Sequence, residues 1–489
     1  MNALSLLVVA VPFAAAVITW MFGWRPFTAW LGVISSAVIV GGGIALAFRI
    51  LDSGPIITFY DLIRVDALSA WMIIVIGSVA TIANTYAVPY IGSELEDGKT
   101  DAASARTYGF LVQIFVSAMV AAVVAHNVGV MWVAVEFTTI ATAFLVGHHK
   151  DNKALEASWK YIIIGSVGVT MALLGTVLVF LAARNGIDGE SASLNWTSLV
   201  AVAPQLDPGV MRLAIGLLVL GFGTKVGLAP VHTWLPDAHS QAPAPVSALM
   251  SGVLLAVAFY AILRYKVIAD AALGTGYLRG LLIAASLLTL LVAASALLAQ
   301  RDYKRMLALS SIEHMGIIAL GTAVGSPLAI GGVLLHMFAH GMGKTVLFCG
   351  SGEILHEYGS TRISDVRGML RAHPFVGGSF GLALLALLGM PPFGLFPSEL
   401  AIVRAGFAEG AGWAVAIALI LIFVIFAALA NHGQQMLLGP ESEPGAIRES
   451  PSLPIVMPLV LGLITLALLG ITSWPYASLL HEAVATVTP

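Results

Sequence analysis

Several acidic, lysine and histidine side chains stand alone inside long apolar stretches of this sequence. They are Glu136, Lys225, His314, His336, His340, Lys344 and Glu399. An ionisable group in hydrocarbon is costly, and such groups commonly mark ion pathways and proton relays. Acid, lysine and histidine groups alternating along a path, with waters between them, predict proton transfer. No serine stands with a histidine and an orienting acid in a recognisable motif, so nucleophilic catalysis is not indicated.

Glu136 and Lys225 could form the first pair of such a relay. Glu136 lies near the middle of VGVMWVAVEFTTIATAFLVG, too far from either end for its short side chain to reach water. At an effective dielectric constant of about 20, a carboxylate ~4 Å from a lysine stabilises the charged lysine by about 4 kcal/mol. We therefore predict that Glu136 controls the proton on Lys225. Two alternatives stay open: a protonated, hydrogen-bonded Glu136, and a Lys225 whose stem carries the ammonium to a polar region.

His336, His340 and Lys344 recur every four residues in LLHMFAHGMGKTVLF, so they lie near one face of a helix. Imidazole exchanges protons near neutral pH, which predicts a relay along that face. A pair of structural core histidines is the alternative. Two histidines four residues apart can also hold zinc, but no Cys, Asp or Glu lies nearby in the sequence to complete the ligand set. We therefore expect no metal ion here.

The stretch RDYKRMLALSSIEHMG adds further titratable candidates. Glu313 and His314 lie deep in this stretch, whereas Lys304 stands at its start beside Arg301 and Arg305. Lys304 is a candidate member of the relay. The alternative is an anchor at the positively charged membrane surface.

Other charged or titratable side chains are interpreted structurally. Lys160 begins an apolar stretch and is expected to anchor it at the membrane surface, while His148 and His149 are expected in a loop. In WLPDAHS, Asp237 and His239 are expected to hydrogen-bond backbone amides that the neighbouring prolines leave exposed.

The elements that must position these groups are apolar helices, two of which are interrupted. Prolines break the apolar pattern within residues 221–252, just after a lone lysine, and again within residues 389–399, GMPPFGLFPSE. A broken membrane helix is tolerated only where protein or a water-filled cavity surrounds it. Paired breaks also mark transporters with internal repeats. We predict repeats over residues 107–265 and 278–435; a chance match of prolines is the alternative.

Composition places the chain in a membrane. Of its 489 residues, 59% are hydrophobic and 10% charged, and the mean hydropathy is +0.95. Soluble domains carry about 25% charged residues, and apolar runs of about 20 residues can cross a bilayer. We predict one all-α transmembrane domain over residues 1–489. Its fourteen expected spans are 3–22, 28–50, 67–90, 108–126, 128–147, 157–183, 210–229, 246–264, 279–299, 306–324, 328–350, 375–401, 411–431 and 453–473.

Motifs for several cofactors are absent from the sequence. Its one cysteine, Cys349, permits neither an internal disulfide nor a cysteine-ligated iron–sulfur cluster or zinc site. There is no Walker A motif and no dinucleotide fingerprint beside a strand. We therefore expect no cofactor, no redox centre and no ATP use in this chain. The apolar N-terminus lacks a basic segment before it, so it is interpreted as the first span and not as a signal peptide.

Basic residues predict the orientation of the chain. Loops after odd-numbered spans hold more Lys and Arg than loops after even-numbered spans. Because basic loops stay in the cytoplasm, the odd loops are expected there and both termini outside.

Five stretches carry a family resemblance. They are KVGLAPVHTWLPDAHSQAPAPVSALMSGVLL, VEFTTIATAFLVG, RDYKRMLALSSIEHMG, LHMFAHGMGKTVLF and GMPPFGLFPSE. Together they resemble the antiporter-like subunits of respiratory complex I, Mrp sodium/proton antiporters and group 4 membrane-bound hydrogenases. The similarity runs from about residue 60 to 435. KVGLAPVHTWLPDAHS, with the chain length, looks closest to the F-type subunit of hydrogenase-4 and formate hydrogenlyase-like complexes.

The resemblance implies fourteen spans, two inverted five-helix repeats, and breaks in spans seven and twelve. It also implies that Glu136 pairs with Lys225, that central lysines and histidines relay protons, and that Glu399 is the exit charge. One departure concerns span eight, which lacks the lysine or histidine of many relatives, so Ser247, Ser251 and water are expected to carry that step. We also expect no lateral amphipathic helix after the last span, which the longest relatives possess.

The leading functional hypothesis is a proton- or sodium/proton-translocating subunit of a redox-driven complex in a prokaryotic cytoplasmic membrane. Its expected partners are other membrane subunits and the lipid bilayer, and no nucleic acid. The alternatives are a subunit of a multi-chain Mrp-type sodium/proton antiporter, a structural membrane subunit that does not conduct, and a free-standing solute transporter. No substrate-sized polar pocket can be read from the sequence to support the last of these.

Overall fold

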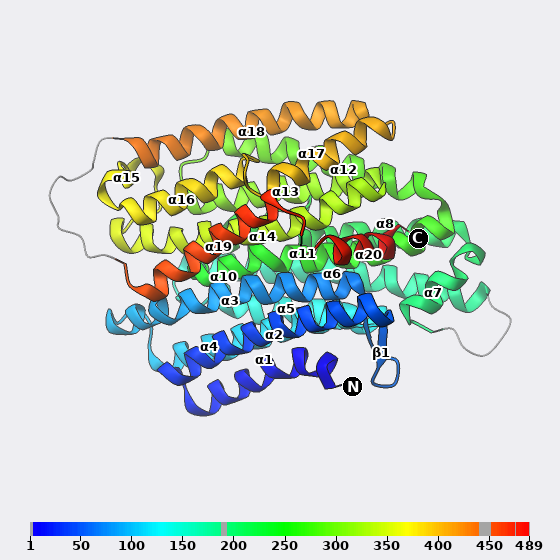
Figure 1. Ribbon diagram of the computed structural model, residues 1–489, viewed down its shortest axis with the longest axis horizontal. Helices are drawn as coiled ribbons and strands as arrows, with labels where there is room; N and C mark the ends of the chain where they lie inside the picture. The colour runs from blue at the N-terminus through cyan, green and yellow to red at the C-terminus, as the bar shows by residue number, and fades with distance from the viewer. Residues whose placement is uncertain (1–2, 187–192, 440–450, 475, 489) are drawn as a thin grey trace.

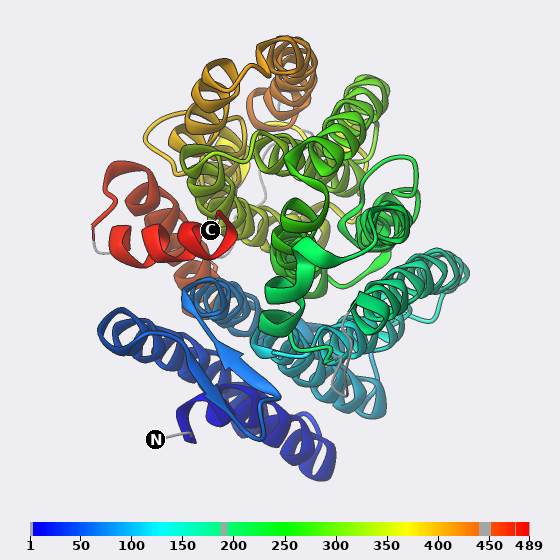
Figure 2. The ribbon, with the colours of Figure 1, turned by 90° about the vertical axis from the view of Figure 1, so that its right-hand side faces the viewer.

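The chain folds into a bundle of roughly parallel α-helices. The computed structural model describes residues 3–186, 193–439, 451–474 and 476–488. The helices run side by side along the long axis of the molecule (Figure 1). Seen along the helices, the N-terminal helices lie on one side of the bundle and the helices of the second half on the other (Figure 2).

Twelve helices of the described ranges are long and apolar enough to cross a bilayer, which confirms a polytopic membrane fold. The unbroken ones are α1 (Ala3–Phe22), α2 (Pro26–Ser53), α3 (Ala67–Glu96), α4 (Ala102–Val124), α5 (Val128–Val146), α6 (Asn152–Gly186), α12 (Thr275–Leu298), α13 (Tyr303–Val324), α18 (Gly412–Leu438) and α19 (Leu453–Ile471). The hydrophobic stretch of α13 is fully buried, whereas those of α1, α18 and α19 are mostly exposed. The outer helices therefore face lipid or neighbouring chains.

Two further expected spans are built differently. The eleventh is α14 (Pro327–Tyr358), a single long helix that carries buried histidines and a buried lysine among its apolar residues. The twelfth consists of two short helices, α16 (Pro374–Leu387) and α17 (Leu395–Ala408), separated by the predicted break. Together with the seventh and eighth spans, described next, these elements give each of the expected spans a counterpart in the structure.

The seventh span ends inside the bundle at a glycine. Helix α8 (Pro208–Val226) stops at Gly227, whose φ of 85° lies in the left-handed region that glycine adopts readily. The short helix α9 (Trp234–Gln241) follows. The eighth span is then built from α10 (Ala244–Leu249), the π-helical turn η2 (Met250–Leu254) and α11 (Leu255–Leu273). The prolines thus break the chain where the sequence predicted.

Groups from outside the break satisfy its exposed backbone. The amide of Ala229 donates to Thr289 Oγ1 of α12 at 2.9 Å. The indole Nε1 of Trp234 donates to the carbonyl of Thr224 at 2.8 Å. These bonds replace the helical ones that the prolines remove, so the interruption can stay buried.

Asp237 and His239 do not bond the amides of the break, so that prediction is wrong. The Asp237 carboxylate accepts from Lys160 at 3.0 Å and from Arg305. The imidazole of His239 is fully buried, and neither ring nitrogen has a hydrogen-bond partner among the described residues. Asp237 therefore ties α9 to α6 and α13, because it is the one acid within reach of both exposed cations. His239 points to a different role.

The second break packs tightly against α19. Gly389 takes a φ of 66°, in the left-handed region, just after α16 ends. The amide of Gly394 donates to the carbonyl of Leu466 in α19 at 2.9 Å. At Gly470 a β carbon would lie 2.0 Å from the carbonyl oxygen of Pro392. The close approach of the two segments therefore requires a glycine at position 470.

Short elements cluster at the two ends of the bundle. Both ends of the chain lie toward the same end (Figure 1). That end also carries the antiparallel hairpin of β1 (Ile56–Thr58) and β2 (Ile63–Val65), with α7 (Trp196–Val202), η1 (Ala203–Gln205) and α20 (Ala477–Val487). The opposite end carries η3 (Ile363–Asp365) and α15 (Met369–Ala372). None of these short elements was predicted from the sequence, because they interrupt no apolar pattern.

Three basic residues counted as loop residues in the sequence are buried within helices. Arg264 of α11 makes a bidentate ion pair with Asp66, with both N–O distances 2.7 Å. Lys266 pairs with Asp270 at 2.6 Å, and Lys304 is also buried. Arg264 and Lys266 no longer count among the basic residues in loops after even-numbered spans, and Lys304 no longer counts among those after odd-numbered spans. Loops after odd-numbered spans therefore still hold more basic residues. The orientation across the membrane stays a prediction.

Candidate functional site

Lys225 lies at the end of α8, fully buried beside the first break. Its Nζ donates to Thr139 Oγ1 and to the hydroxyl of Tyr161, each at 2.6 Å. The Thr139 hydroxyl in turn donates to Glu136 at 3.1 Å, and Ser166 donates to the other carboxylate oxygen at 3.3 Å. Three helices, α5, α6 and α8, thus converge on one hydrogen-bonded chain.

Glu136 and Lys225 are linked, but they are not in direct contact. Their charged atoms do not approach within 4.0 Å, the limit of an ion pair, although Glu136 is the charge that acts on Lys225. The Thr139 hydroxyl stands between them because it lies one turn after Glu136 on the same face of α5. Glu136 and Lys225 are therefore connected indirectly, through the Thr139 hydroxyl. Glu136 itself is only partly buried, next to the exposed Phe137.

Three histidines from α13 and α14 meet in the second half of the bundle. His314 Nδ1 faces His336 Nε2 at 3.0 Å, and the rings of His314 and His340 have centroids 5.0 Å apart. All three side chains are fully buried. Neither nitrogen of His340 has a hydrogen-bond partner within the described part of the chain. The structure therefore brings together the three histidines that the sequence singled out, from two different helices.

Lys344 continues this group along α14 and is fully buried. Its Nζ donates to the carbonyl of Leu307 at 2.8 Å and to the hydroxyl of Ser310. Glu313 is also buried, and one of its carboxylate oxygens has no described partner. An acid and a lysine thus accompany the histidines on the facing sides of α13 and α14.

Lys304 is buried at the start of α13, unlike its exposed neighbours Arg301 and Arg305. Its Nζ donates to the carbonyl of Ala242 at 3.1 Å, the residue that ends α9. Lys304 therefore lies against the first break. This contact disfavours the surface-anchor interpretation.

Glu399, on α17, reaches the histidines across the second break. One ligand atom each of His314, His336 and Glu399 lie within 4.8 Å of one another. No acid lies near His336 in the sequence, but the fold brings Glu399 to it from 63 positions beyond His336 and 85 beyond His314. The absence of a metal ion stays a prediction. His336 Nδ1 also lies 3.0 Å from Ser398 Oγ. Both nitrogens of His336 already have partners, so a metal ion would have to displace these bonds.

His239 occupies the region between the two groups. Its ring stacks on Phe348 of α14, with centroids 5.5 Å apart, and lies 6.3 Å from the Trp234 ring. Trp234 in turn packs against Tyr161, with centroids 4.8 Å apart. An imidazole therefore lies next to the eighth span, which has no lysine or histidine near its start.

The serines expected to serve the eighth span have defined partners. Ser247 Oγ donates to the carbonyl of His239 at 2.8 Å, and Ser251 Oγ lies 2.7 Å from Ser311 Oγ. Ser251 lies in the π-helical turn, a feature that is frequent at functional sites. The hydroxyls thus lie beside His239 and α13, and whether they carry protons stays a prediction.

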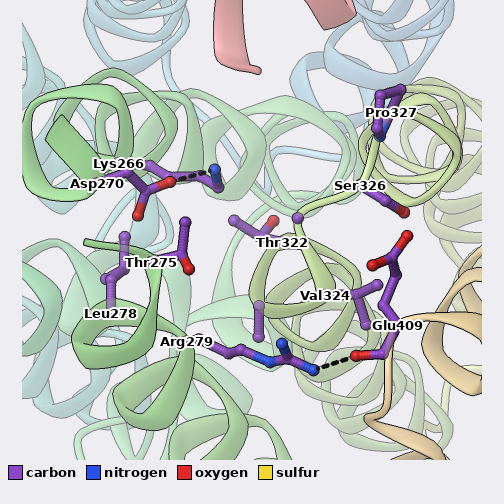
Figure 3. A pocket seen from close by; sticks show the side chains of 12 residues that line it. Lys266, Asp270, Thr275, Leu278, Arg279, Thr322, Val324, Ser326, Pro327 and Glu409 are labelled. Carbon is purple, nitrogen blue, oxygen red and sulfur yellow. Dashed lines mark hydrogen bonds and ion pairs between the residues drawn. The ribbon is translucent and has the colours of Figure 1, made fainter. Parts of the chain in front are cut away.

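A polar pocket of about 330 Å³ opens near the end of the bundle that carries the chain termini. It lies where α11, α12, α13 and α14 meet, and Figure 3 shows its charged groups: Lys266 bonded to Asp270, and Arg279 donating to the backbone carbonyl of Glu409. Thr322 lines it from α13. His314 lies eight positions before Thr322 on the same helix, so at a rise of 1.5 Å per residue the pocket lies about 12 Å along α13 from His314.

Several partners in these groups were not identified from the sequence: Thr139, Tyr161, Ser166, Ser310 and Ser398. Thr139, Ser310 and Ser398 had a local signal, since each lies within one helical turn of an acid. Tyr161 and Ser166 had none, because the groups they contact lie on other helices.

Comparison with known proteins decides the family. Residues 125–427 match the family described as "NADH:quinone oxidoreductase/Mrp antiporter, TM". The chain belongs to this family. It is therefore an antiporter-like subunit of the multi-pass membrane type. The hydrogenase-4 component F homologue of Methylacidiphilum infernorum is 35% identical to this antiporter-like subunit over 90% of the chain and 91% of that protein.

Solved structures share the fold of this antiporter-like subunit. A chain of the membrane-bound sulfane sulfur reductase, an archaeal respiratory membrane complex, aligns with a TM-score of 0.88, 24% identity, and coverage of 99% of this chain and 97% of that one. A chain of the Mrp complex from Dietzia aligns with a TM-score of 0.86, 20% identity, and coverage of 100% and 98%. At these identities the likeness concerns the fold alone.

Proposed function

We propose that this antiporter-like subunit translocates protons through the buried groups described above. Lys225, held by Thr139 next to Glu136, accepts and releases a proton in the first half. His239, Lys304, Lys344 and the three histidines carry it through the centre, and Glu399 receives it. The observation that carries the proposal is the burial of titratable groups on facing helices in one membrane bundle.

The energy for this transport comes, in our proposal, from a redox partner complex related to hydrogenase-4. The support is the 35% identity to a protein named as a hydrogenase-4 component F homologue. No iron–sulfur or nucleotide motif is present in this sequence, so electrons would pass elsewhere in the complex. Other membrane subunits are then its partners, and the prokaryotic cytoplasmic membrane is its location.

The two halves of the path have different outlets. We propose that the first half, residues 107–265, and the second, 278–435, are inverted repeats, as the paired breaks suggest. The polar pocket near Lys266 and Glu409 would be the outlet of the second half (Figure 3). It lies at the end with the chain termini, which the basic loops predict to be outside.

Replacement of Lys225 by Met tests the proposal in the intact complex. The variant should assemble and keep its redox reaction, yet lose at least nine-tenths of the proton transfer, because methionine fills the space without holding a proton. Proton uptake into reconstituted vesicles at matched turnover measures this. Lys99→Met, at an exposed lysine, is the control and should pump normally. Full pumping by the Lys225 variant would contradict the proposal and favour a structural subunit.

A sodium/proton exchanger is the second candidate, supported by the fold shared with a chain of the Mrp complex. Co-purification in mild detergent separates the two candidates. Redox subunits in the purified complex support the first candidate. Only small membrane chains, together with sodium-dependent proton movement in vesicles without a redox substrate, support the second.

A further inference from the structure

A second polar pocket lies at the opposite end of the bundle, beside the start of α13. Its volume is about 560 Å³. The lining side chains used in the argument are Gln300, Arg301, Arg362, Ser364, His432 and Gln435. They come from the loop between α12 and α13, from η3 and the residue before it, and from the end of α18. None of the described lining residues carries a carboxylate.

The backbone holds the two arginines of this pocket close together. The segment around Arg301 pairs with the segment around Arg362: the amide of Ile363 donates to the carbonyl of Arg301 at 2.9 Å, and the amide of Tyr303 donates to the carbonyl of Thr361 at 3.0 Å. Both arginine side chains are exposed residues of the pocket wall. Two guanidinium groups that start from adjacent backbone can both reach one phosphate, which each can bind in a planar, bidentate geometry.

Two acids that neighbour these arginines in the sequence accept hydrogen bonds from other groups. The Asp302 carboxylate accepts from the hydroxyl of Thr361 and from the amide of Arg305 at 2.9 Å. The Asp365 carboxylate accepts from the hydroxyls of Ser360 and Ser364. The pocket wall is therefore positively charged toward its interior, and the neighbouring acids only partly offset it.

His432 gives the pocket a further specific group. It is 8% exposed, and its Nε2 lies 3.1 Å from the carbonyl of Leu297, which can only accept. Nε2 therefore carries the hydrogen, and in the neutral ring Nδ1 is an acceptor. This buried Nδ1 has no partner among the residues that the structure describes. A ligand with a hydroxyl group would satisfy it.

Apolar side chains lie next to this polar pocket at the ends of the same helices. Leu298, the last residue of α12, is 61% exposed, and Leu438, the last residue of α18, is 65% exposed. Leu291, two turns earlier on α12, is also exposed. A ligand with a phosphate, a hydroxyl and hydrocarbon chains would contact all of these groups at once.

We propose that this pocket binds the headgroup of an anionic glycerophospholipid of the phosphatidylglycerol type. Arg301 and Arg362 bind its phosphate, His432 Nδ1 accepts from a headgroup hydroxyl, and the acyl chains lie along α12 and α18. The basic loops place the pocket on the predicted cytoplasmic side, where anionic lipids attract basic residues. The proposal depends on the membrane fold alone and is independent of what the chain transports.

Lipid retention in the intact, purified complex tests the phosphate contacts. After exchange into mixed phosphatidylglycerol and phosphatidylethanolamine, native mass spectrometry should find one phosphatidylglycerol retained by the wild-type complex. Arg301→Gln with Arg362→Gln should lower its occupancy at least tenfold. Arg25→Gln, an exposed arginine between α1 and α2, is the matched control and should retain the lipid. Equal retention by the double variant would overturn the proposal.

Two further measurements keep the test decisive if the double variant fails to assemble. The wild-type complex should prefer phosphatidylglycerol to phosphatidylmethanol, which has the phosphate but no hydroxyl, and His432→Leu should abolish that preference. Inorganic phosphate at 10 mM, on the order of a thousandfold above the lipid, should not displace it. No lipid preference in the wild type, or displacement by phosphate alone, would assign the pocket to a soluble anion and contradict a lipid site.

Discussion

At the scale of single residues, the hydroxyl of Thr139 decides how the first acid and the first lysine communicate. It accepts a hydrogen bond from Lys225 and donates one to Glu136, so its single hydrogen points toward Glu136. If Lys225 loses a proton, this hydroxyl can turn toward the neutral amine, and the carboxylate then loses a donor. The charge state of Glu136 and that of Lys225 are therefore coupled through one rotatable bond.

Thr139→Val should slow proton transfer without unfolding the bundle, since valine keeps the shape and removes the hydroxyl. A hydrogen bond to a charged group contributes about 1.5–3 kcal/mol, so the rate should fall by about one to two orders of magnitude. Thr139→Ser should restore it. Proton uptake into vesicles measures both. The Thr139 bridge would be irrelevant if valine and serine pumped equally well.

His336→Leu with His340→Leu should abolish proton transfer while the complex still assembles, because both imidazoles lie on the buried face between α13 and α14. Metal analysis of the wild-type complex should find no stoichiometric zinc, since the nitrogens of His336 are already hydrogen-bonded. Zinc present in the wild type and lost in the variant would contradict the relay.

Sequence alone identified the lone charges but not their surroundings. Glu136, Lys225 and the histidines of α14 stand out because hydrocarbon tolerates few ionisable groups. Lys304 looks like an anchor in sequence, three residues from Arg301, and only the packing of α13 against α9 shows that it is buried. Contacts of this kind depend on helices far apart in the chain, which local patterns do not encode.

At the scale of elements, the two interrupted spans are stabilised by different means. The first is held by side-chain hydrogen bonds: its Ala229 amide donates to Thr289, and its Trp234 indole donates to the carbonyl of Thr224. The second lies against the backbone of α19, where Leu466 accepts an amide and Gly470 leaves room for the chain. The prolines predicted both interruptions, but nothing in the sequence near them indicated α19 as the partner.

Gly470→Ala should separate α19 from the second break, because its β carbon would meet the carbonyl of Pro392. Overpacking of this kind costs about 1–3 kcal/mol, so the thermal unfolding temperature of the complex should fall. Gly41→Ala in α2 is the matched control, since nothing lies within 4 Å of its added carbon. Equal unfolding temperatures for the two variants would contradict the tight contact.

The loop between α5 and α6 supplies a pH-dependent contribution to stability. Burial, with a smaller contribution from the nearby His149, lowers the pKa of His148 to about 4. Between pH 6.5 and 4 the unfolded chain therefore binds a proton that the folded chain does not, so stability falls as the pH falls through that window. At 1.36 kcal/mol per pKa unit, the largest change that His148 can make in the free energy of unfolding is about 3 kcal/mol.

His148→Gln should remove this contribution, because glutamine does not titrate. Thermal unfolding at pH 7 and pH 5 measures it: the difference between the two pH values should shrink in the variant. An unchanged difference would show that His148 is not the titrating group.

At the scale of the whole molecule, the bundle has two chemically different ends. One carries both chain ends, the β hairpin, α7 and α20, and the other carries the basic loops around α13 and α15. The burial of Arg264, Lys266 and Lys304 removes these residues from the loop charges without reversing the bias. The basic end is therefore expected in the cytoplasm.

Reporter fusions test this orientation. Alkaline phosphatase fused after Pro489 should be active, since it requires an extracytoplasmic location, and green fluorescent protein at the same position should not fluoresce after export. Fusions in the loop between α3 and α4 should show the opposite pattern. A fluorescent, intact fusion at the C-terminus would reverse the orientation.

The ion pair of Asp66 and Arg264 has a consequence for how the protein is made. The two residues are 198 positions apart, Asp66 just before α3 and Arg264 on α11. During synthesis the ribosome delivers α3 to the insertion machinery long before α11 exists, so at first only the nearby Arg64 and Ser69 can bond the Asp66 carboxylate. A half-made chain thus displays a carboxylate that lacks its bidentate partner until the eighth span arrives. Membrane quality-control proteases could distinguish finished from stalled chains by that single group.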